Sequence, residues 1–256
     1  MVKYSHLSES ELRRYNRHII IPGIGEDGQL KLKNASVLVV GAGGLGCPVL
    51  QYLAAAGIGK IGLVDFDMVN ETNLPRQILY GAADIGKLKS VISKQRLSIL
   101  NDNTDVRILN IRFGKNNALE MVNGYDIIVD ATDNYESRYI INDACIISGK
   151  PMVHGAIYHF EGQVAVFNYN DGPTYRCYNP ARTGEYHNPE PTETGMINIL
   201  PGITGTYMAN EVIKMILQKG NVLAGEVLIF NILTNRSYLF KVTPDPENRK
   251  NLEIIH

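Results

Sequence analysis

The stretch VLVVGAGGLG, residues 37–46, decides the fold of this chain. Its first four residues are aliphatic and mostly β-branched, which is typical of a buried parallel strand. The glycines that follow have the spacing G-x-G-x-x-G, from Gly41 through Gly43 to Gly46. Glycines at this spacing let backbone N–H groups and the start of a helix face a phosphate without side-chain obstruction. The stretch therefore predicts the nucleotide-binding turn of a Rossmann-like α/β fold.

A second strand follows this turn in the run KIGLVDFD and ends at Asp65 and Asp67. Asp65 lies 19 residues after Gly46 (65 − 46), close to the spacing of roughly 20 at which an acidic residue binds ribose hydroxyls. The turn and this acid together predict a ligand that contains adenosine. They do not decide between NAD and ATP.

The remaining patterns predict a mostly parallel sheet with helices on both faces. Strand and helix patterns alternate up to Gly155, as in folds built from βαβ units. Beyond it, residues 161–170 and 226–242 alternate like antiparallel strands, and residues 204–220 predict a buried helix. The first residues predict a further helix over 8–19, in which Ser8 and Glu11 form a capping box. Because no linker separates the halves, we expect a single domain.

Composition excludes several classes of protein. The chain has 256 residues, with 25 Lys+Arg against 26 Asp+Glu, so its charge offers no general attraction to nucleic acid or an anionic membrane. The first twenty residues are too polar for a signal peptide, and no apolar run reaches 18 residues. Three scattered cysteines make no disulfide framework. We therefore expect a soluble, cytoplasmic protein that binds neither nucleic acid nor membrane.

The segment after the second strand favours ATP over NAD. It reads VNETNLPRQ and is followed by Lys89 and by the turn at residues 132–134. Arginine and lysine suit triphosphate oxygens, and an aspartate at the carboxyl edge of a strand suits Mg²⁺. Hydride transfer needs no such cations, whereas nucleotidyl transfer does, because charge develops on the phosphates. Each residue alone is compatible with an ordinary surface position, and their order makes ATP the better ligand.

These motifs together resemble the ThiF/MoeB/HesA family, the bacterial relatives of ubiquitin-activating E1 enzymes. The matching segments run in family order over most of the chain: RYNRHIIIPGIGEDGQ, VLVVGAGGLG, YLAAAGIGKIGLVDFD, NLPRQ, IGKLK, DATDN, GAIYHFEGQV and LPGITG. The resemblance implies an α/β E1/ThiF fold that continues into antiparallel strands. It also implies a helical arm (residues 1–35), a nucleotide-binding half (36–155) and a carrier-binding half (156–256) with a crossover loop at about 182–195.

The resemblance implies an adenylyltransferase. The C-terminal Gly-Gly carboxylate of a small ubiquitin-like sulfur carrier (ThiS- or MoaD-like) would attack the α-phosphate of MgATP. The products would be an acyl-adenylate and pyrophosphate, for thiamin or molybdopterin biosynthesis. The implied catalytic residues are Arg17, Arg76, Lys89 and Asp133, with Asp133 also associated with Mg²⁺ and Arg17 donated across a homodimer. The implied nucleotide-binding residues are Gly41, Gly43, Gly44, Gly46, Asp65, Asp67, Thr72, Asn73, Leu74, Pro75, Arg76, Gln77, Lys89, Asp133 and Asn134.

The sequence departs from the family pattern in its cysteines. Many members hold a structural zinc with two Cys-x-x-Cys pairs, but here only Cys177 remains, with Thr174 at the first position of its pair. One thiolate cannot close a tetrahedral site, so we expect no zinc. The crossover-loop position where several members carry a reactive cysteine falls near Pro191, which puts a covalent step in doubt. We interpret Cys47, Cys145 and Cys177 as small buried hydrophobes.

Other interpretations remain open at this stage. His154 and His159 flank a strand, and neither has a partner pattern for metal binding or nucleophilic catalysis, so structural roles are expected. The chain could adenylate another carboxylate, such as a peptide C-terminus or one carried by tRNA, although its neutral charge disfavours tRNA. A nicotinamide-dependent oxidoreductase and a non-catalytic scaffold are the remaining alternatives.

Overall fold

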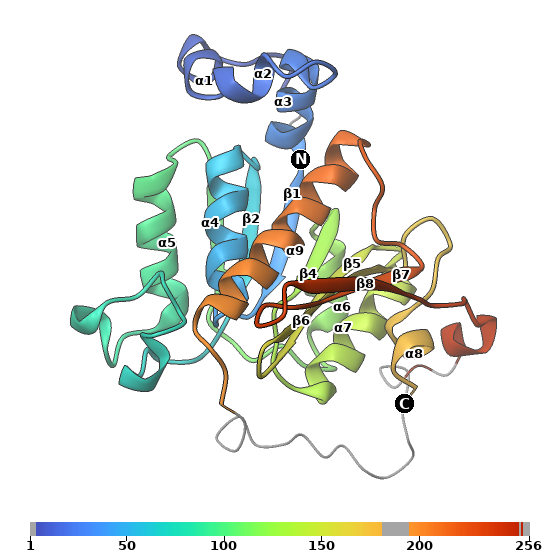
Figure 1. Cartoon of the computed structure of the whole chain (residues 1–256). Coiled ribbons are helices and arrows are strands. Elements are labelled where there is room, and N and C mark those ends of the chain that lie inside the picture. Colours follow the sequence, from blue (N-terminus) through green and yellow to red (C-terminus); the bar gives the residue numbers. More distant parts are fainter. Residues whose placement is uncertain (1–3, 181–194, 251, 253–256) are drawn as a thin grey trace.

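One eight-stranded sheet organises the computed structural model, which describes residues 4–180, 195–250 and 252 (Figure 1). Its strand order is β3-β2-β1-β4-β5-β6-β7-β8. The first five strands in this order are parallel, and β6, β7 and β8 continue the sheet in antiparallel fashion. This confirms the predicted fold class. The strands are β1 (Ser36–Val40), β2 (Lys60–Val64), β3 (Asp105–Leu109), β4 (Ile127–Asp130), β5 (Met152–Tyr158), β6 (Glu161–Phe167), β7 (Glu226–Asn231) and β8 (Arg236–Lys241).

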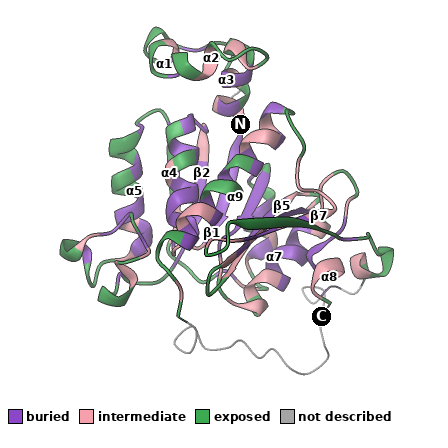
Figure 2. Ribbon diagram, in the orientation of Figure 1, coloured by how far each residue is buried: buried purple, intermediate pink, exposed green. Residues whose placement is uncertain are grey.

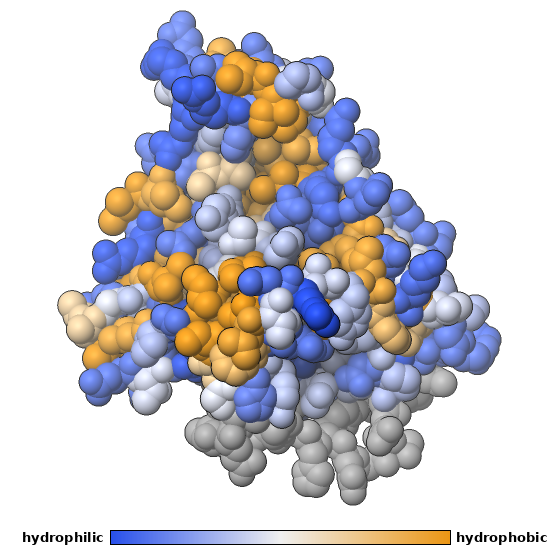
Figure 3. All heavy atoms as spheres, viewed as in Figure 1, coloured by the Kyte–Doolittle hydropathy of each residue, from blue (hydrophilic) through white to orange (hydrophobic). Residues whose placement is uncertain are grey.

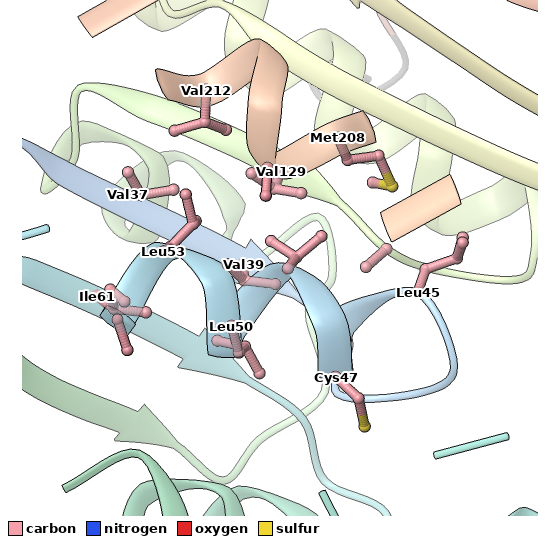
Figure 4. Packing of buried hydrophobic residues seen from close by; sticks show 14 of the residues in the cluster. Val37, Val39, Leu45, Cys47, Leu50, Leu53, Ile61, Val129, Met208 and Val212 are labelled. Carbon is pink, nitrogen blue, oxygen red and sulfur yellow. The ribbon is translucent and has the colours of Figure 1, made fainter. Parts of the chain in front are cut away.

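Helices cover both faces of the sheet and bury its centre (Figure 2). One face carries α4 (Gly46–Ala56), α5 (Lys89–Leu100) and α9 (Ile199–Leu217); the other carries α6 (Ala118–Asn123), α7 (Tyr135–Ser148) and α8 (Tyr175–Tyr178). Every residue of β1 is buried, as its unbroken apolar run predicts. Figure 4 shows Leu53 of α4 and Val212 of α9 beside Val37 of β1. Burial of each such side chain contributes about 1.5–3 kcal/mol, so this packing fixes the position of the turn after β1.

The N-terminal arm consists of α1 (Glu9–Arg14), α2 (Asn16–Ile19) and α3 (Gly25–Asn34). The predicted capping box is confirmed: Ser8 Oγ accepts from the Glu11 N–H, and the Glu11 carboxylate accepts from the Ser8 N–H at 2.7 Å. The single helix predicted over residues 8–19 is wrong, because Tyr15 leaves helical geometry and divides it in two.

A contact of Tyr15 fastens the arm to the amino ends of the strands, and a contact of Lys33 joins two helices within the arm. The Tyr15 hydroxyl accepts from the Asn101 amide at 2.8 Å, in the turn that precedes β3. Lys33 donates to the Glu11 carboxylate at 2.7 Å. Burial raises the pKa of Glu11, but the hydrogen bonds from Lys33 and Ser8 outweigh it and hold that pKa below its ordinary value. In Figure 1 the arm lies at the top, at the start of β1.

The long helix α9 begins at Ile199, before the predicted residue 204. Pro201 fits the first turn of a helix because its missing N–H would have no partner there. Within the described ranges, none of the helices combines the length and apolar character needed to cross a bilayer. Three short 3₁₀ turns complete the described elements: η1 (Glu71–Asn73), η2 (Ala82–Asp84) and η3 (Pro246–Arg249).

Candidate active site

A pocket of about 780 Å³ opens at the carboxyl ends of the parallel strands. The turns after β1, β2 and β4 form one side of it, and the β5–β6 hairpin and α8 form the other. In open α/β sheets, ligands bind at this edge, where the strand order reverses direction, here between β1 and β4. The pocket therefore lies where the fold places a ligand.

The turn after β1 requires its glycines. Gly41 has φ +99°, and a Cβ there would lie 2.7 Å from the Ala131 carbonyl oxygen. A Cβ on Gly46 would collide with the carbonyl oxygen of Gly41 itself. Gly41, Gly43 and Gly44 line the pocket, whereas Gly46 is buried as the first residue of α4. The turn therefore presents backbone to the pocket, as expected of an anion-binding loop.

Two aspartates and a lysine form the wall after β2. Asp65 accepts from the Ala42 N–H at 2.7 Å and from the Asp67 N–H at 2.9 Å. Burial raises the pKa of Asp65 above its ordinary value, although the Ala42 N–H and the Lys89 charge oppose the rise. Lys89 begins α5 and donates to Asp67 at 2.9 Å, with its side chain 7% exposed. All three side chains line the pocket.

The segment before α5 brings Arg76 and Gln77 to the pocket. Arg76 donates to the Thr72 carbonyl oxygen at 2.8 Å, and the Asn73 carbonyl accepts from the N–H groups of Arg76 and Gln77. Among the described residues, buried Gln77 Oε1 has no hydrogen-bond partner. Four further predicted residues support this segment without lining the described pocket: Thr72, Asn73, Leu74 and Pro75.

The turn after β4 presents Asp133 and Asn134 to the pocket. Asn134 is the N-cap of α7 and accepts from the Ser137 N–H at 2.9 Å. Asp133 is exposed. No three His, Cys, Asp or Glu side chains of the described residues converge on a metal site. Since Mg²⁺ at a nucleotide usually takes one or two carboxylates together with phosphate oxygens and water, the single carboxylate of Asp133 fits that use.

Arg17 does not join the other predicted residues. It is exposed on α2, in the arm that packs against the amino ends of the strands. The pocket lies at the carboxyl ends, so the five-residue strand β1 alone separates the two sites by about 16 Å. Arg17 therefore cannot serve the pocket of its own chain in this conformation.

Several pocket residues escaped the sequence analysis. His154, for which only a structural role is expected, lines the pocket and has a buried partner, Asp130, at 2.7 Å. Arg138 of α7 also lines the pocket, and Tyr178 of α8 donates to Gln163 of β6 at 2.8 Å. Asp130 stands in the DATDN motif and Arg138 four residues after it, so position relative to that motif was the available signal.

The cysteines are only partly as expected. Cys47 and Cys145 are buried, and burial raises the pKa of Cys47 to about 12. The interpretation of Cys177 as a buried hydrophobe is wrong: it is half-buried, and its sulfur accepts from the N–H groups of Thr174 and Asp245, both at 3.4 Å. The Asn248 amide donates to the same sulfur at 3.8 Å. The crossover loop lies outside the described residues, except for Gly195.

The sheet and the pocket together define a Rossmann-like α/β protein with an anion-binding turn. The ThiF family model matches residues 15–252, and the chain belongs to this family. It is 46% identical over 231 residues to the sulfur carrier protein adenylyltransferase of Thermus thermophilus, covering 88% of this chain and 85% of that one. It is 48% identical to the probable molybdopterin-synthase adenylyltransferase of Porphyra purpurea, covering 94% of this chain but 63% of that protein's length. Less than two thirds of the second relative is therefore matched.

A solved structure shows the same fold at low sequence identity. The crystal structure of Escherichia coli MccB with ATP has a TM-score of 0.79 to this chain at 22% identity, covering 93% of this chain and 73% of that one. At this identity the likeness concerns the fold alone.

Proposed function

We propose that this chain adenylates the C-terminal carboxylate of a small ubiquitin-like sulfur carrier protein, using MgATP. The single observation that carries the proposal is the convergence of the glycine turn, Arg76, Lys89 and Asp133 on one pocket. Adenylyl transfer as the class of reaction agrees with the names of the two relatives. A sulfur carrier as the substrate agrees with the first of these names, and a place in molybdopterin biosynthesis agrees with the second. A carrier for thiamin biosynthesis is the other branch of the proposal.

The reaction needs no nucleophilic side chain, because the carboxylate of the carrier is itself the nucleophile. One carboxylate oxygen forms a bond to the α-phosphorus of ATP, and the bond between that phosphorus and the bridging oxygen breaks, releasing pyrophosphate. Arg76 and Lys89 would offset the negative charge on the phosphates, and the glycine turn would donate backbone N–H groups. Mg²⁺, when bound at Asp133, would neutralise phosphate charge. Asp65 would bind the ribose.

An apolar sheet surface beside the pocket supports docking of a carrier. In the β5–β6 hairpin, Tyr158 is 56% exposed and Phe160 is 40% exposed. On the edge strand β8, the side chains of Tyr238 and Phe240 are exposed on the face of the sheet that carries α8. Because exposed aromatic and aliphatic side chains of this size mark interaction surfaces, we propose that the carrier docks here. Its C-terminus would then enter the pocket between the hairpin and α8.

We further propose a homodimer in which Arg17 enters the pocket of the partner chain. Its support is the position of Arg17, exposed and remote from its own pocket, beside exposed Ile20 and Ile21. An apolar groove between α4 and α9, which includes Tyr52 and Ile199, offers a second contact surface. Figure 3 shows apolar atoms gathered where these helices begin. We also propose that the chain acts as one domain, with the helical arm at residues 1–35, and that it works in the cytoplasm.

ATP–pyrophosphate exchange tests the proposed reaction. We expect exchange that depends on a Gly-Gly-ended carrier from the same genome, and an Asp133→Ala variant that folds normally but has lost it. Normal exchange by Asp133→Ala would refute the assignment of this pocket.

A further inference from the structure

A buried, hydrogen-bonded pair of an aspartate and a histidine lies beneath the candidate active site. Asp130 is the last residue of β4, and His154 is its direct neighbour on the parallel strand β5. His154 Nδ1 lies 2.7 Å from Asp130 Oδ2, and the two residues are 1% and 0% exposed. Since a carboxylate accepts, Nδ1 carries the proton and donates. Burial of a carboxylate costs free energy unless the carboxylate is paired and hydrogen-bonded, so Asp130 depends on its hydrogen-bond partners.

The other oxygen of Asp130 holds the turn that carries Asp133. Asp130 Oδ1 accepts from the Thr132 N–H at 3.1 Å and from the Thr132 hydroxyl at 2.6 Å. Arg138 donates to the Thr132 carbonyl oxygen at 3.2 Å. The N–H, hydroxyl and carbonyl groups of Thr132 therefore all form hydrogen bonds with the side chain of Asp130 or Arg138. Asp133 follows immediately and is itself exposed at the pocket wall.

The same turn packs against the glycine loop. The Ala131 N–H donates to the Val40 carbonyl at 2.9 Å, and the Ala131 carbonyl occupies the space that a side chain on Gly41 would need. A shift of the turn would therefore move Asp133 relative to the phosphate-binding loop. Asn134 fixes the other end of the turn by capping α7.

We propose that His154 and Asp130 are positioning residues that set the place of Asp133 against the nucleotide loop, through Thr132. The inference rests on the proposed function, because it gives Asp133 its task. Neither residue needs to touch substrate. His154 donates to one oxygen of Asp130, which leaves the other oxygen aimed at Thr132.

The electrostatics of the pair agree with this role. Burial raises the pKa of Asp130, but the hydrogen bonds from His154 and Thr132 and the nearby charge of Arg138 outweigh it and hold that pKa below its ordinary value. Burial lowers the pKa of His154 despite the carboxylate. A neutral imidazole that donates from Nδ1 is therefore the state that serves the turn at neutral pH. Without the His154 donor, the buried carboxylate of Asp130 keeps only its hydrogen bonds with Thr132. The turn that carries Asp133 is then held less firmly.

Five variants together separate a positioning role of His154 from a packing role. His154→Leu removes the donor, while His154→Asn keeps an N–H group near the place of Nδ1. Met152→Ala is the matched control, because Met152 is equally buried two residues earlier on β5 and has no part in the pair. Thr132→Val removes the hydroxyl group that donates to Asp130 Oδ1. It takes the place of His154→Leu in the test if that variant does not fold. Asp133→Ala is measured in parallel.

For each variant we would measure three quantities: the urea midpoint of unfolding, the ATP affinity by calorimetry with and without Mg²⁺, and the kcat and KM of pyrophosphate exchange. We expect His154→Leu to lower kcat by about 10- to 100-fold, as for a misplaced catalytic group, with KM for the carrier unchanged. It should also reduce the gain in ATP affinity that Mg²⁺ gives. His154→Asn should recover kcat to within about threefold of wild type, and Met152→Ala should lose stability without losing kcat.

Two results would overturn the inference alone, and a third would overturn the proposed function with it. One is a His154→Leu enzyme with wild-type kcat and a wild-type effect of Mg²⁺ while Asp133→Ala is inactive, which would leave the proposed function standing. The other is a loss of kcat that is equal in His154→Asn and His154→Leu. In that case the loss of kcat would follow the fall of the urea midpoint in these variants and in Met152→Ala alike. Normal exchange by Asp133→Ala would overturn the proposed function and this inference together.

Discussion

Replacement of Lys89 by methionine should separate activity from stability. Lys89 opens α5, with its stem buried and its ammonium group 2.9 Å from Asp67 at the pocket wall. Methionine keeps most of the stem's packing and removes the charge. The effect on folding and the effect on the reaction can therefore be estimated separately.

The change in stability should be small. The Asp67 side chain is 51% exposed, so it can be hydrated once its partner is gone, and partly exposed ion pairs contribute about 0–1 kcal/mol. The lysine ammonium is desolvated, and its removal ends that cost. We therefore expect the free energy of unfolding to change by less than about 1 kcal/mol. Loss of a preorganised charge at the phosphates should cost about 3–4 kcal/mol in the transition state, or roughly 100- to 1,000-fold in kcat/KM.

The assay is ATP–pyrophosphate exchange alongside urea unfolding, with Lys87→Met as control. Lys87 also faces an acidic partner, Asp84 at 3.6 Å, but its side chain is 55% exposed and lies outside the pocket lining. The control should keep full exchange. The reasoning fails if Lys89→Met exchanges within threefold of wild type, or if its loss of activity matches its fraction of unfolded protein.

Four other predictions follow from the structure. Gly41→Ala should lower the free energy of unfolding by about 1–3 kcal/mol and weaken ATP binding, because φ is +99° and a Cβ would lie 2.7 Å from the Ala131 carbonyl oxygen. Gly124→Ala is the control in the same denaturation series and should do neither, because Gly124 is exposed and has φ −76°. Arg17→Ala and Asp133→Ala should each be inactive alone, yet regain about a quarter of wild-type exchange when refolded as an equal mixture, since hybrid dimers would hold one complete site; no recovery would contradict donation in trans. Glu11→Gln should destabilise the chain at neutral pH and match wild type in acid: a carboxyl group with a lowered pKa stabilises the fold above its unfolded-state value of 4.5, and that contribution disappears as the pH falls through the lower folded value. Elemental analysis of the purified protein should find less than stoichiometric zinc, and one zinc per chain would refute our interpretation of the cysteine pattern.

Much of the fold could be predicted from local patterns. The apolar run of β1, the glycine turn and the capping box at Ser8 each specify their structure through neighbouring residues, and all three predictions are confirmed. Boundaries were less predictable where local signals compete. Pro201 suggests an interruption of α9, but it fits the first turn of a helix that starts earlier. Nothing in the run around Tyr15 signals that the helix of the arm divides there.

The residues of the candidate site also differ in how far the sequence predicts them. Residues of contiguous motifs, such as Asp65 or Asp133, could be assigned because the motif itself places them at a strand end. The pairing of Asp130 with His154 depends on the register of two strands separated by 24 residues along the chain, which no local pattern encodes. Two of the hydrogen bonds to the sulfur of Cys177 likewise come from residues about 70 positions later in the chain, Asp245 and Asn248. Partners of this kind emerge only from the folded sheet.

Transfer of an oxygen label tests the central claim most directly. A Gly-Gly-ended carrier labelled with ¹⁸O in its C-terminal carboxylate is incubated with the enzyme and MgATP, and hydroxylamine then cleaves the acyl product. Attack at the α-phosphorus predicts ¹⁸O in the released AMP, because the bridging oxygen leaves with the nucleotide. Unlabelled AMP, or label in inorganic phosphate beside ADP, would contradict adenylation of the carrier by this chain.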